Sequence, residues 1–122
     1  MKLRINSNSL RYRLTQTDVA NLFKEGCIKE KVNFGNNELV YVLQGIVDKE
    51  ISADFKNNIV TMYIPKIMID ELVNTNKVGF ENNNGELKLL IEKDFTCLDN
   101  VAEDQSDNYP NPLAENNYAK RQ

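Results

Sequence analysis

The 122-residue chain contains no histidine and no tryptophan. Histidine is the side chain most often used as a general base near neutral pH and the commonest zinc ligand, so its absence removes the usual basis for both kinds of site. The chain also lacks a glycine-rich phosphate loop and a dinucleotide-binding fingerprint. No base stands beside the candidate nucleophiles Ser52, Ser106, Cys27 and Cys97. We therefore expect a protein that is not an enzyme and that holds no metal or cofactor.

Cysteine and long apolar runs are also scarce. Cys27 and Cys97 are the two cysteines, and each follows the end of a predicted element. A disulfide between them is geometrically possible, but no export signal places the chain in an oxidising compartment, so we expect two buried or half-buried thiols. Met1 leads directly into an alternating strand, and no segment approaches the roughly 18 apolar residues of a membrane span. We expect a cytoplasmic protein without membrane association, either a monomer or a homodimer.

The apolar residues that are present recur when the chain is shifted by 50 positions. Residues 1–47 and 51–93 then align as two units, each patterned as two strands, a helix and two more strands. The aligned positions are Leu3, Ile5, Leu10, Tyr12 and Leu14 with Ala53, Phe55, Val60, Met62 and Ile64, then Val19, Leu22 and Phe23 with Ile69, Leu72 and Val73. After a gap, Val32 and Phe34 align with Val78 and Phe80, and Leu39, Tyr41 and Leu43 align with Leu87, Leu89 and Ile91. Ordinary α+β patterning is the alternative explanation, but the Asn-rich turns also align, which favours a repeat.

Local signals define the elements within each unit. Thr15 and Asp18 approximate a capping box that begins a helix, and Gly26 is the expected left-handed residue that ends it. Pro65 is expected in the first turn of the second helix, where its missing N–H has no cost. The segment 38–47 is apolar on both faces, which predicts a central strand. Asn84-Gly85 is a strong hairpin turn signal.

Neither unit of about 45 residues is expected to support a core without a metal or disulfides, so the two units should share one. We therefore expect a single α+β domain at residues 1–95, in which two ββαββ units form one pseudo-twofold β-barrel with two short helices. From residue 96 the periodicity ends. Residues 96–122 are predicted to be an acidic tail, rich in asparagine, that is draped over the domain or disordered.

The net charge of −3 is unevenly distributed, with +3 in residues 1–47, −3 in residues 48–95 and −3 in residues 96–122. In the first predicted hairpin, cationic residues alternate with apolar ones and should share one face. This basic face consists of Lys2, Arg4, Arg11 and Arg13. It predicts an anion or nucleic-acid contact surface, with ion pairing to acids of the second unit, such as Asp54, as the alternative.

The tail contains a predicted partner-binding set: Asp99, Glu103, Asp104, Asp107 and Tyr109. Its spacing lacks the alternating ligands and central glycine of a calcium loop, so it is interpreted as a solvated tail or as a contact for a basic partner. Glu30 is the one carboxylate in a potentially buried position, although a place at a sheet edge is favoured. An isolated carboxylate does not make an acid–base pair.

Ile64-Pro65-Lys66, with Asn58-Ile59-Val60-Thr61 before it and Met68 and Leu72 after it, resembles the signature of the swapped-hairpin (AbrB/MazE-like) family. Val78-Gly79-Phe80-Glu81 and Gly85-Glu86-Leu87 continue the resemblance. In that family two such units form one barrel, and in MraZ-like proteins both occupy one chain. The resemblance implies DNA binding, or toxin binding through an acidic tail. Two arginines of the family pattern are Thr61 and Ile69 here.

Two further stretches resemble a family of short bacterial proteins of unknown function. They are the opening Arg4-Ile5 with Asn8-Ser9-Leu10-Arg11-Tyr12-Arg13-Leu14-Thr15, and the closing Glu92-Lys93-Asp94-Phe95-Thr96-Cys97-Leu98 with the segment 103–112. This resemblance covers nearly the whole chain and implies no activity. The sequence thus favours a binding or regulatory protein that uses the basic face, and more specifically a DNA-binding regulator. The alternative is an antitoxin-like interaction module that binds a protein partner through its tail.

Overall fold

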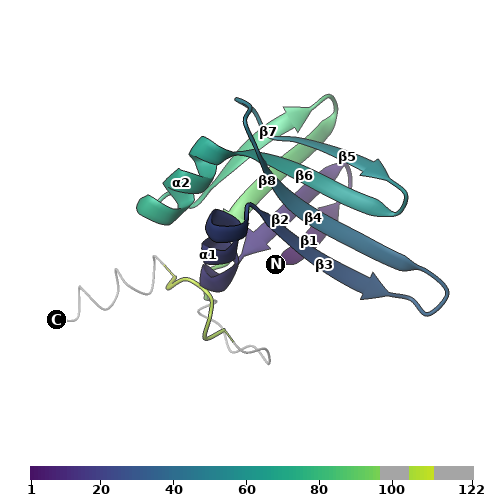
Figure 1. The fold of residues 1–122 in the computed structure, drawn as a ribbon, viewed down its shortest axis with the longest axis horizontal. Helices are drawn as coiled ribbons and strands as arrows, with labels where there is room; N and C mark the ends of the chain where they lie inside the picture. Colours follow the sequence, from purple (N-terminus) through teal and green to yellow (C-terminus); the bar gives the residue numbers. More distant parts are fainter. Residues whose placement is uncertain (97–104, 112–122) are drawn as a thin grey trace.

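The computed structural model describes residues 1–96 and 105–111, which form eight strands and two helices (Figure 1). The first unit contains β1 (Lys2–Asn6), β2 (Ser9–Leu14), α1 (Gln16–Glu25), β3 (Cys27–Asn33) and β4 (Glu38–Ile46). The second contains β5 (Ser52–Lys56), β6 (Ile59–Pro65), α2 (Lys66–Asn74), β7 (Gly79–Asn84) and β8 (Leu87–Lys93). Both helices lie at the same end of the strands (Figure 1). The α+β class is confirmed.

Each unit contributes one hairpin to each of two four-stranded sheets. The strand orders are β1-β2-β8-β7 and β3-β4-β6-β5, so β4 is central as predicted. The middle pair of each sheet is parallel and joins the two units: Tyr12 pairs with Ile91, and Leu43 pairs with Met62. The sequence alignment matches Tyr12 with Met62 and Leu43 with Ile91, so the two parallel pairs consist of equivalent residues. The strand pairing therefore confirms the internal similarity of the units.

The alignment of the third strands was wrong. Ile28 pairs with Leu43, and Phe80 pairs with Ile91. Since Leu43 and Ile91 are equivalent, the counterpart of Phe80 is Ile28 and not Phe34, whose side chain is 66% exposed. The cause is the placement of a loop: β3 begins one residue after the Gly26 cap, whereas residues 75–78 separate α2 from β7.

The two sheets do not close into the single barrel that was expected, because within the described residues no backbone ladder joins them. Side chains span the gaps between edge strands instead. Between β5 and β7, Asn82 Nδ2 donates to Ile51 O at 2.8 Å and Asn84 Nδ2 donates to Ala53 O at 3.3 Å. On the side where β1 and β3 are the edge strands, the hydroxyl of Tyr41, from the central strand β4, donates to Met1 O at 3.0 Å. These bridges leave the architecture as two facing sheets.

One hydrophobic core lies between the sheets and beneath the helices, and both units supply it. Its helical residues are Val19 and Leu22 of α1 and their equivalents Ile69 and Leu72 of α2. The predicted capping box is present at α1, and Gly26 ends that helix with φ 78°. Pro65 precedes α2 as its N-cap residue and provides no side-chain cap. The helices are therefore alike in packing and different in their N-termini.

Candidate functional site

The four residues of the basic face are direct cross-strand neighbours in the β1–β2 hairpin. Lys2 lies opposite Arg13, and Arg4 lies opposite Arg11. The intervening residues of β2 are buried in the core, so the four cations share the outer surface of their sheet. Like charges placed opposite one another destabilise a sheet unless an anion or acid is near.

Two of these cations have acidic partners in the last strand region of the second unit. Arg11 Nε lies 2.8 Å from Glu92 Oε1, and Lys2 Nζ lies 3.0 Å from Asp94 Oδ2. Both carboxylate oxygens are buried and accept no aligned hydrogen bond, so charge attraction is their main compensation. Asp54 is not involved: it lies in the other sheet and accepts a hydrogen bond from the Tyr63 hydroxyl at 3.0 Å.

Arg4 and Arg13 make no ion pair with any residue in 1–96 or 105–111. Beside Arg4 the surface forms a small recess of about 70 Å³, lined by Arg4, Asn6, Ser9 and Arg11. Every lining side chain carries a hydrogen-bond donor and none is a carboxylate. This recess, the arginine recess, has the chemistry and approximate size to hold one small oxyanion group.

Residues 105–111 pack against the domain. Tyr109 forms a parallel bridge with Phe95, its N–H donates to Asp94 O at 2.7 Å, and its carbonyl accepts from the N–H of Thr96 at 2.7 Å. Of the predicted partner-binding residues, Asp107 and Tyr109 are thus in contact with the domain. Asp99, Glu103 and Asp104 lie outside the described residues, as does Cys97, whereas Cys27 is a half-buried free thiol.

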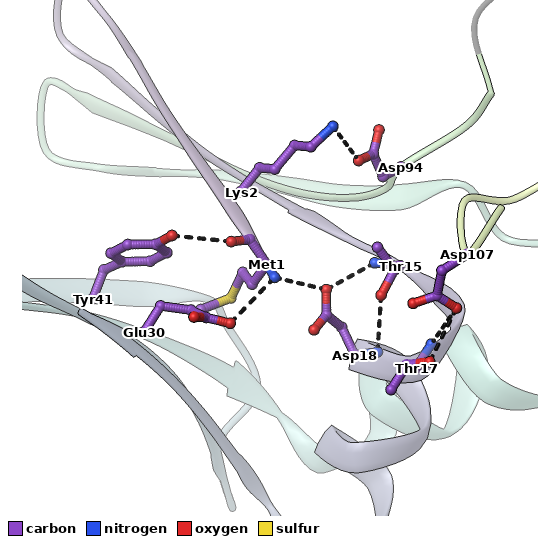
Figure 2. A network of polar contacts seen from close by, with 9 residues as sticks. All are labelled: Met1, Lys2, Thr15, Thr17, Asp18, Glu30, Tyr41, Asp94 and Asp107. Carbon is purple, nitrogen blue, oxygen red and sulfur yellow. Dashed lines mark hydrogen bonds and ion pairs between the residues drawn. The ribbon is translucent and has the colours of Figure 1, made fainter. Parts of the chain in front are cut away.

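Asp107 provides a second cap for helix α1 (Figure 2). Its carbonyl accepts from the N–H of Gln16 at 3.0 Å, and its Oδ1 accepts from the N–H and hydroxyl of Thr17 at 3.3 and 3.0 Å. Thr15 caps the next N–H, that of Asp18, at 3.2 Å. Hydrogen bonds from the Thr15 hydroxyl and from Thr17 hold the pKa of Asp107 below its usual value, against the opposing effect of burial. The first three N–H groups of α1 are therefore all occupied.

The same corner of the fold holds the start of β1 (Figure 2). The α-ammonium of Met1 lies 2.9 Å from Asp18 Oδ2 and 3.5 Å from Glu30 Oε1. The Glu30 side chain is 42% exposed and belongs to the edge strand β3, so the potentially buried carboxylate of the sequence lies at a sheet edge. Asp18 and Glu30 therefore share the Met1 ammonium as a common partner, and Asp18 also accepts a hydrogen bond from the N–H of Thr15.

A pocket of about 360 Å³ lies between the first half of α1 and the end of α2, and we name it the lysine pocket. Lys93 is only 7% exposed, donates from Nζ to Thr75 O at 3.1 Å, and places Nζ 4.9 Å from the centroid of the Tyr109 ring. Burial lowers the pKa of Lys93 and raises that of Tyr109. Sequence reasoning missed Lys93, although the alternation Leu89, Ile91, Lys93 places it on the inward face of its strand.

An equivalent pocket of about 320 Å³, the counterpart pocket, lies between the end of α1 and the first half of α2. Lys93 pairs with Leu14, and Gly45 pairs with Ile64. Because Leu14 and Ile64 are repeat equivalents, Gly45 stands where the second unit has Lys93. A Cβ atom at Gly45 would lie 3.0 Å from Ile69 Cδ1 and 3.2 Å from Gly26 O, so no side chain fits there without adjustment.

Among the described residues, no group of three or more cysteine or acidic side chains is arranged to hold a metal ion. No helix in that part of the chain is long and apolar enough to cross a membrane. No curated protein and no solved structure matches the chain. One family profile does match, over residues 1–113, and it includes both units and the docked segment 105–111. The chain therefore belongs to a family of unknown function, DUF7009.

Proposed function

We propose that this chain is a non-enzymatic binding or regulatory protein that contacts an anionic partner through the basic face of its first hairpin. The observation that carries the proposal is the arginine recess beside Arg4, which gathers donor side chains and no acid. Within this face, Arg4 and Arg13 are the cations that would bind the partner, because Lys2 and Arg11 already have carboxylate partners. Guanidinium groups bind phosphate and carboxylate oxygens in bidentate geometry, which suits this role.

A more specific form of the proposal is that the anionic partner is a nucleic acid. An exposed sheet face with several arginines can follow a phosphate backbone without reading bases, and such contacts carry most of non-specific affinity. The acidic total charge opposes this long-range attraction, so we expect weak binding that is visible mainly at low ionic strength.

Fluorescence anisotropy with a short labelled DNA duplex tests this version. Wild-type affinity should fall as salt rises, because each neutralised phosphate releases counterions. In the double variant Arg4→Gln/Arg13→Gln, the slope of log affinity against log salt should be smaller by about 2, corresponding to two lost phosphate contacts.

The matched control is Lys29→Gln/Lys31→Gln, which removes two exposed cations from β3 of the other sheet. It should leave the slope of the wild type nearly unchanged. Absence of affinity at low salt, or affinity that does not respond to salt, would reject DNA as the partner. Equal losses in the two double variants would reject the basic face as the binding surface.

We also propose that the two units are related as in a swapped-hairpin barrel, as the resemblance implies. The exchange of hairpins between the two sheets supports this relation. The alternative function, capture of a basic protein through the tail, stays a prediction, since three of its five residues lie outside the described part. The other two, Asp107 and Tyr109, would have to leave their contacts with α1 and β8 to take part.

A further inference from the structure

We propose that the lysine pocket binds a small molecule in which one carboxylate is attached to an apolar chain or ring, with the Lys93 ammonium as its counter-ion. The pocket is separate from the basic face, and the proposal does not depend on the function argued above. Its volume of about 360 Å³ falls within the range of small-molecule sites. Its position beneath the docked Tyr109 gives it a wall that belongs to neither helix.

The first argument is the unbalanced charge of Lys93. Its Nζ has three donor positions, and one hydrogen bond, to Thr75 O, is the only one it makes to the described residues. No carboxylate of residues 1–96 or 105–111 forms an ion pair with it. A buried ammonium without an anion is costly, and the Tyr109 ring compensates it only in part. A ligand carboxylate would supply the missing charge.

The second argument sets the charge of the ligand. Among the described residues that line the pocket, Lys93 is the only cation. The nearby N-terminus of α1, which might otherwise attract a phosphate, is already occupied by Asp107 and Thr15. One positive charge with no free helix N–H groups suits a monoanion better than a phosphate dianion. Asn76, a lining residue that makes no hydrogen bond to the described residues, offers an additional amide donor.

The third argument sets the rest of the ligand. Val19, Ala20, Leu72 and Val73 supply an apolar wall from both helices. A carboxylate held by Lys93 can therefore carry a short hydrocarbon chain or ring that packs on this wall. The counterpart pocket has no lysine at the equivalent position, which is Gly45 and lies against Ile69 and Lys66 of the lining. Its lining carries both signs of charge in Lys24, Glu25, Lys66 and Asp70. The proposed chemistry is thus confined to one copy of a duplicated pocket.

The test is a titration of the full-length protein with sodium hexanoate, followed by two-dimensional amide NMR. Saturable shifts are expected at Asn76, Lys93 and Tyr109, and hexanamide, which has the same chain without the charge, should bind at least tenfold more weakly. Lys93→Met should also weaken hexanoate at least tenfold, because it removes the counter-ion and keeps the length of the side chain. Lys66→Met is the matched control from the counterpart pocket and should leave the affinity unchanged.

Two further measurements keep the test decisive if Lys93→Met does not fold. Asn76→Ala changes an exposed loop residue and should weaken hexanoate severalfold. In the wild type, affinity should fall as the pH rises through the pKa of Lys93, which burial holds below its ordinary value of 10.5, because the ammonium then loses its proton. The proposal is overturned if hexanamide binds as well as hexanoate, if Lys93→Met or the rise in pH leaves the affinity intact, or if no saturable shift appears in the pocket.

Discussion

The lysine pocket and the counterpart pocket occupy equivalent places between the helices, yet their back walls and covers differ. One has a buried lysine beneath Tyr109, whereas the other has Gly45 at the equivalent position, where an added side chain would be crowded by Ile69 and by the Gly26 carbonyl. The difference coincides with the docking of residues 105–111, which cap α1 through Asp107, whereas α2 begins after Pro65 without a side-chain cap. Duplication kept the packing of the two units similar, and the asymmetry is concentrated where the C-terminal segment binds.

The largest effects on stability are expected from substitutions of equivalent residues in the shared core. Leu22 and Leu72 are equivalent and almost fully buried, so Leu22→Ala and Leu72→Ala should each lower the free energy of unfolding by about 2–5 kcal/mol. Urea denaturation should give a single transition in both variants, because the units share one core. Two separate transitions, or a loss confined to one variant, would contradict that sharing.

Substitutions at the two equivalent positions, Gly45 and Lys93, separate steric from electrostatic effects. Gly45→Ala should destabilise the protein by about 1–3 kcal/mol, because the added methyl group is crowded by Ile69 and by the Gly26 carbonyl. Lys93→Met should be neutral or stabilising by up to about 1 kcal/mol near pH 7, because it removes a buried charge that lacks a carboxylate. Thermal denaturation of the two variants measures the contrast, and a large loss in Lys93→Met would mean that its contact with Thr75 is essential.

The same contrast has a defined pH dependence. The folded-state pKa of Lys93 lies below its unfolded value of 10.5, so between these two values the unfolded chain binds more protons. In that window the wild type gains stability as the pH rises, whereas Lys93→Met does not. The stability difference between them should therefore shrink on approach to pH 10.5, and a difference that stays constant would show that the lysine charge is not the cause.

A smaller effect is expected at the bridged sheet edge. Asn82→Ala removes the hydrogen bond to Ile51 O and should cost about 0.5–1.5 kcal/mol. Asn84→Ala is the matched comparison, and it should cost less because Asn84 is exposed and its hydrogen bond is longer, at 3.3 Å. Equal costs would indicate that burial does not strengthen these edge contacts.

The smallest expected change concerns the cap that α1 receives from Asp107 in the segment 105–111. Because the pKa of Asp107 is lowered on folding, its contribution is present above the unfolded value of 3.8 and is lost as the pH falls through the folded value. Melting temperatures of Asp107→Asn should therefore converge with those of the wild type in acid. Asn keeps an acceptor oxygen, so Asp107→Ala should lower the melting temperature further at neutral pH.

The sequence predicted the local elements well because their signals are local. Thr15, Asp18 and Gly26 marked the limits of α1, and the alternation of apolar residues placed the first hairpin and the buried faces of both helices. The third strand was aligned with the wrong residues of the second unit because Val32 and Phe34 have the apolar alternation of a buried strand but extend beyond the core. The pairing of β3 with β4 is needed to show that the second unit has a longer connection, residues 75–78, between its helix and its third strand.

The sites were less predictable because they depend on contacts between distant segments. That Lys2, Arg4, Arg11 and Arg13 share a face followed from alternation, but the partners Glu92 and Asp94 depend on the parallel pairing of β2 with β8. The lysine pocket requires α1, α2, β8 and the segment around Tyr109 together. Sequence periodicity indicates that Lys93 points inward and does not indicate what surrounds it.

The parallel pairing of β2 with β8 also bears on how the chain reaches its native state. Ser9 pairs with Lys88, so the centre of one sheet forms by closing a loop that spans most of the domain. Contacts of such long sequence separation slow folding, because loop entropy is lost before the contacts form. During synthesis the β2 edge of the first hairpin stays without its parallel partner until β8 emerges from the ribosome. The arginines on the outer face of this hairpin then carry like charges that oppose the association of such incomplete chains.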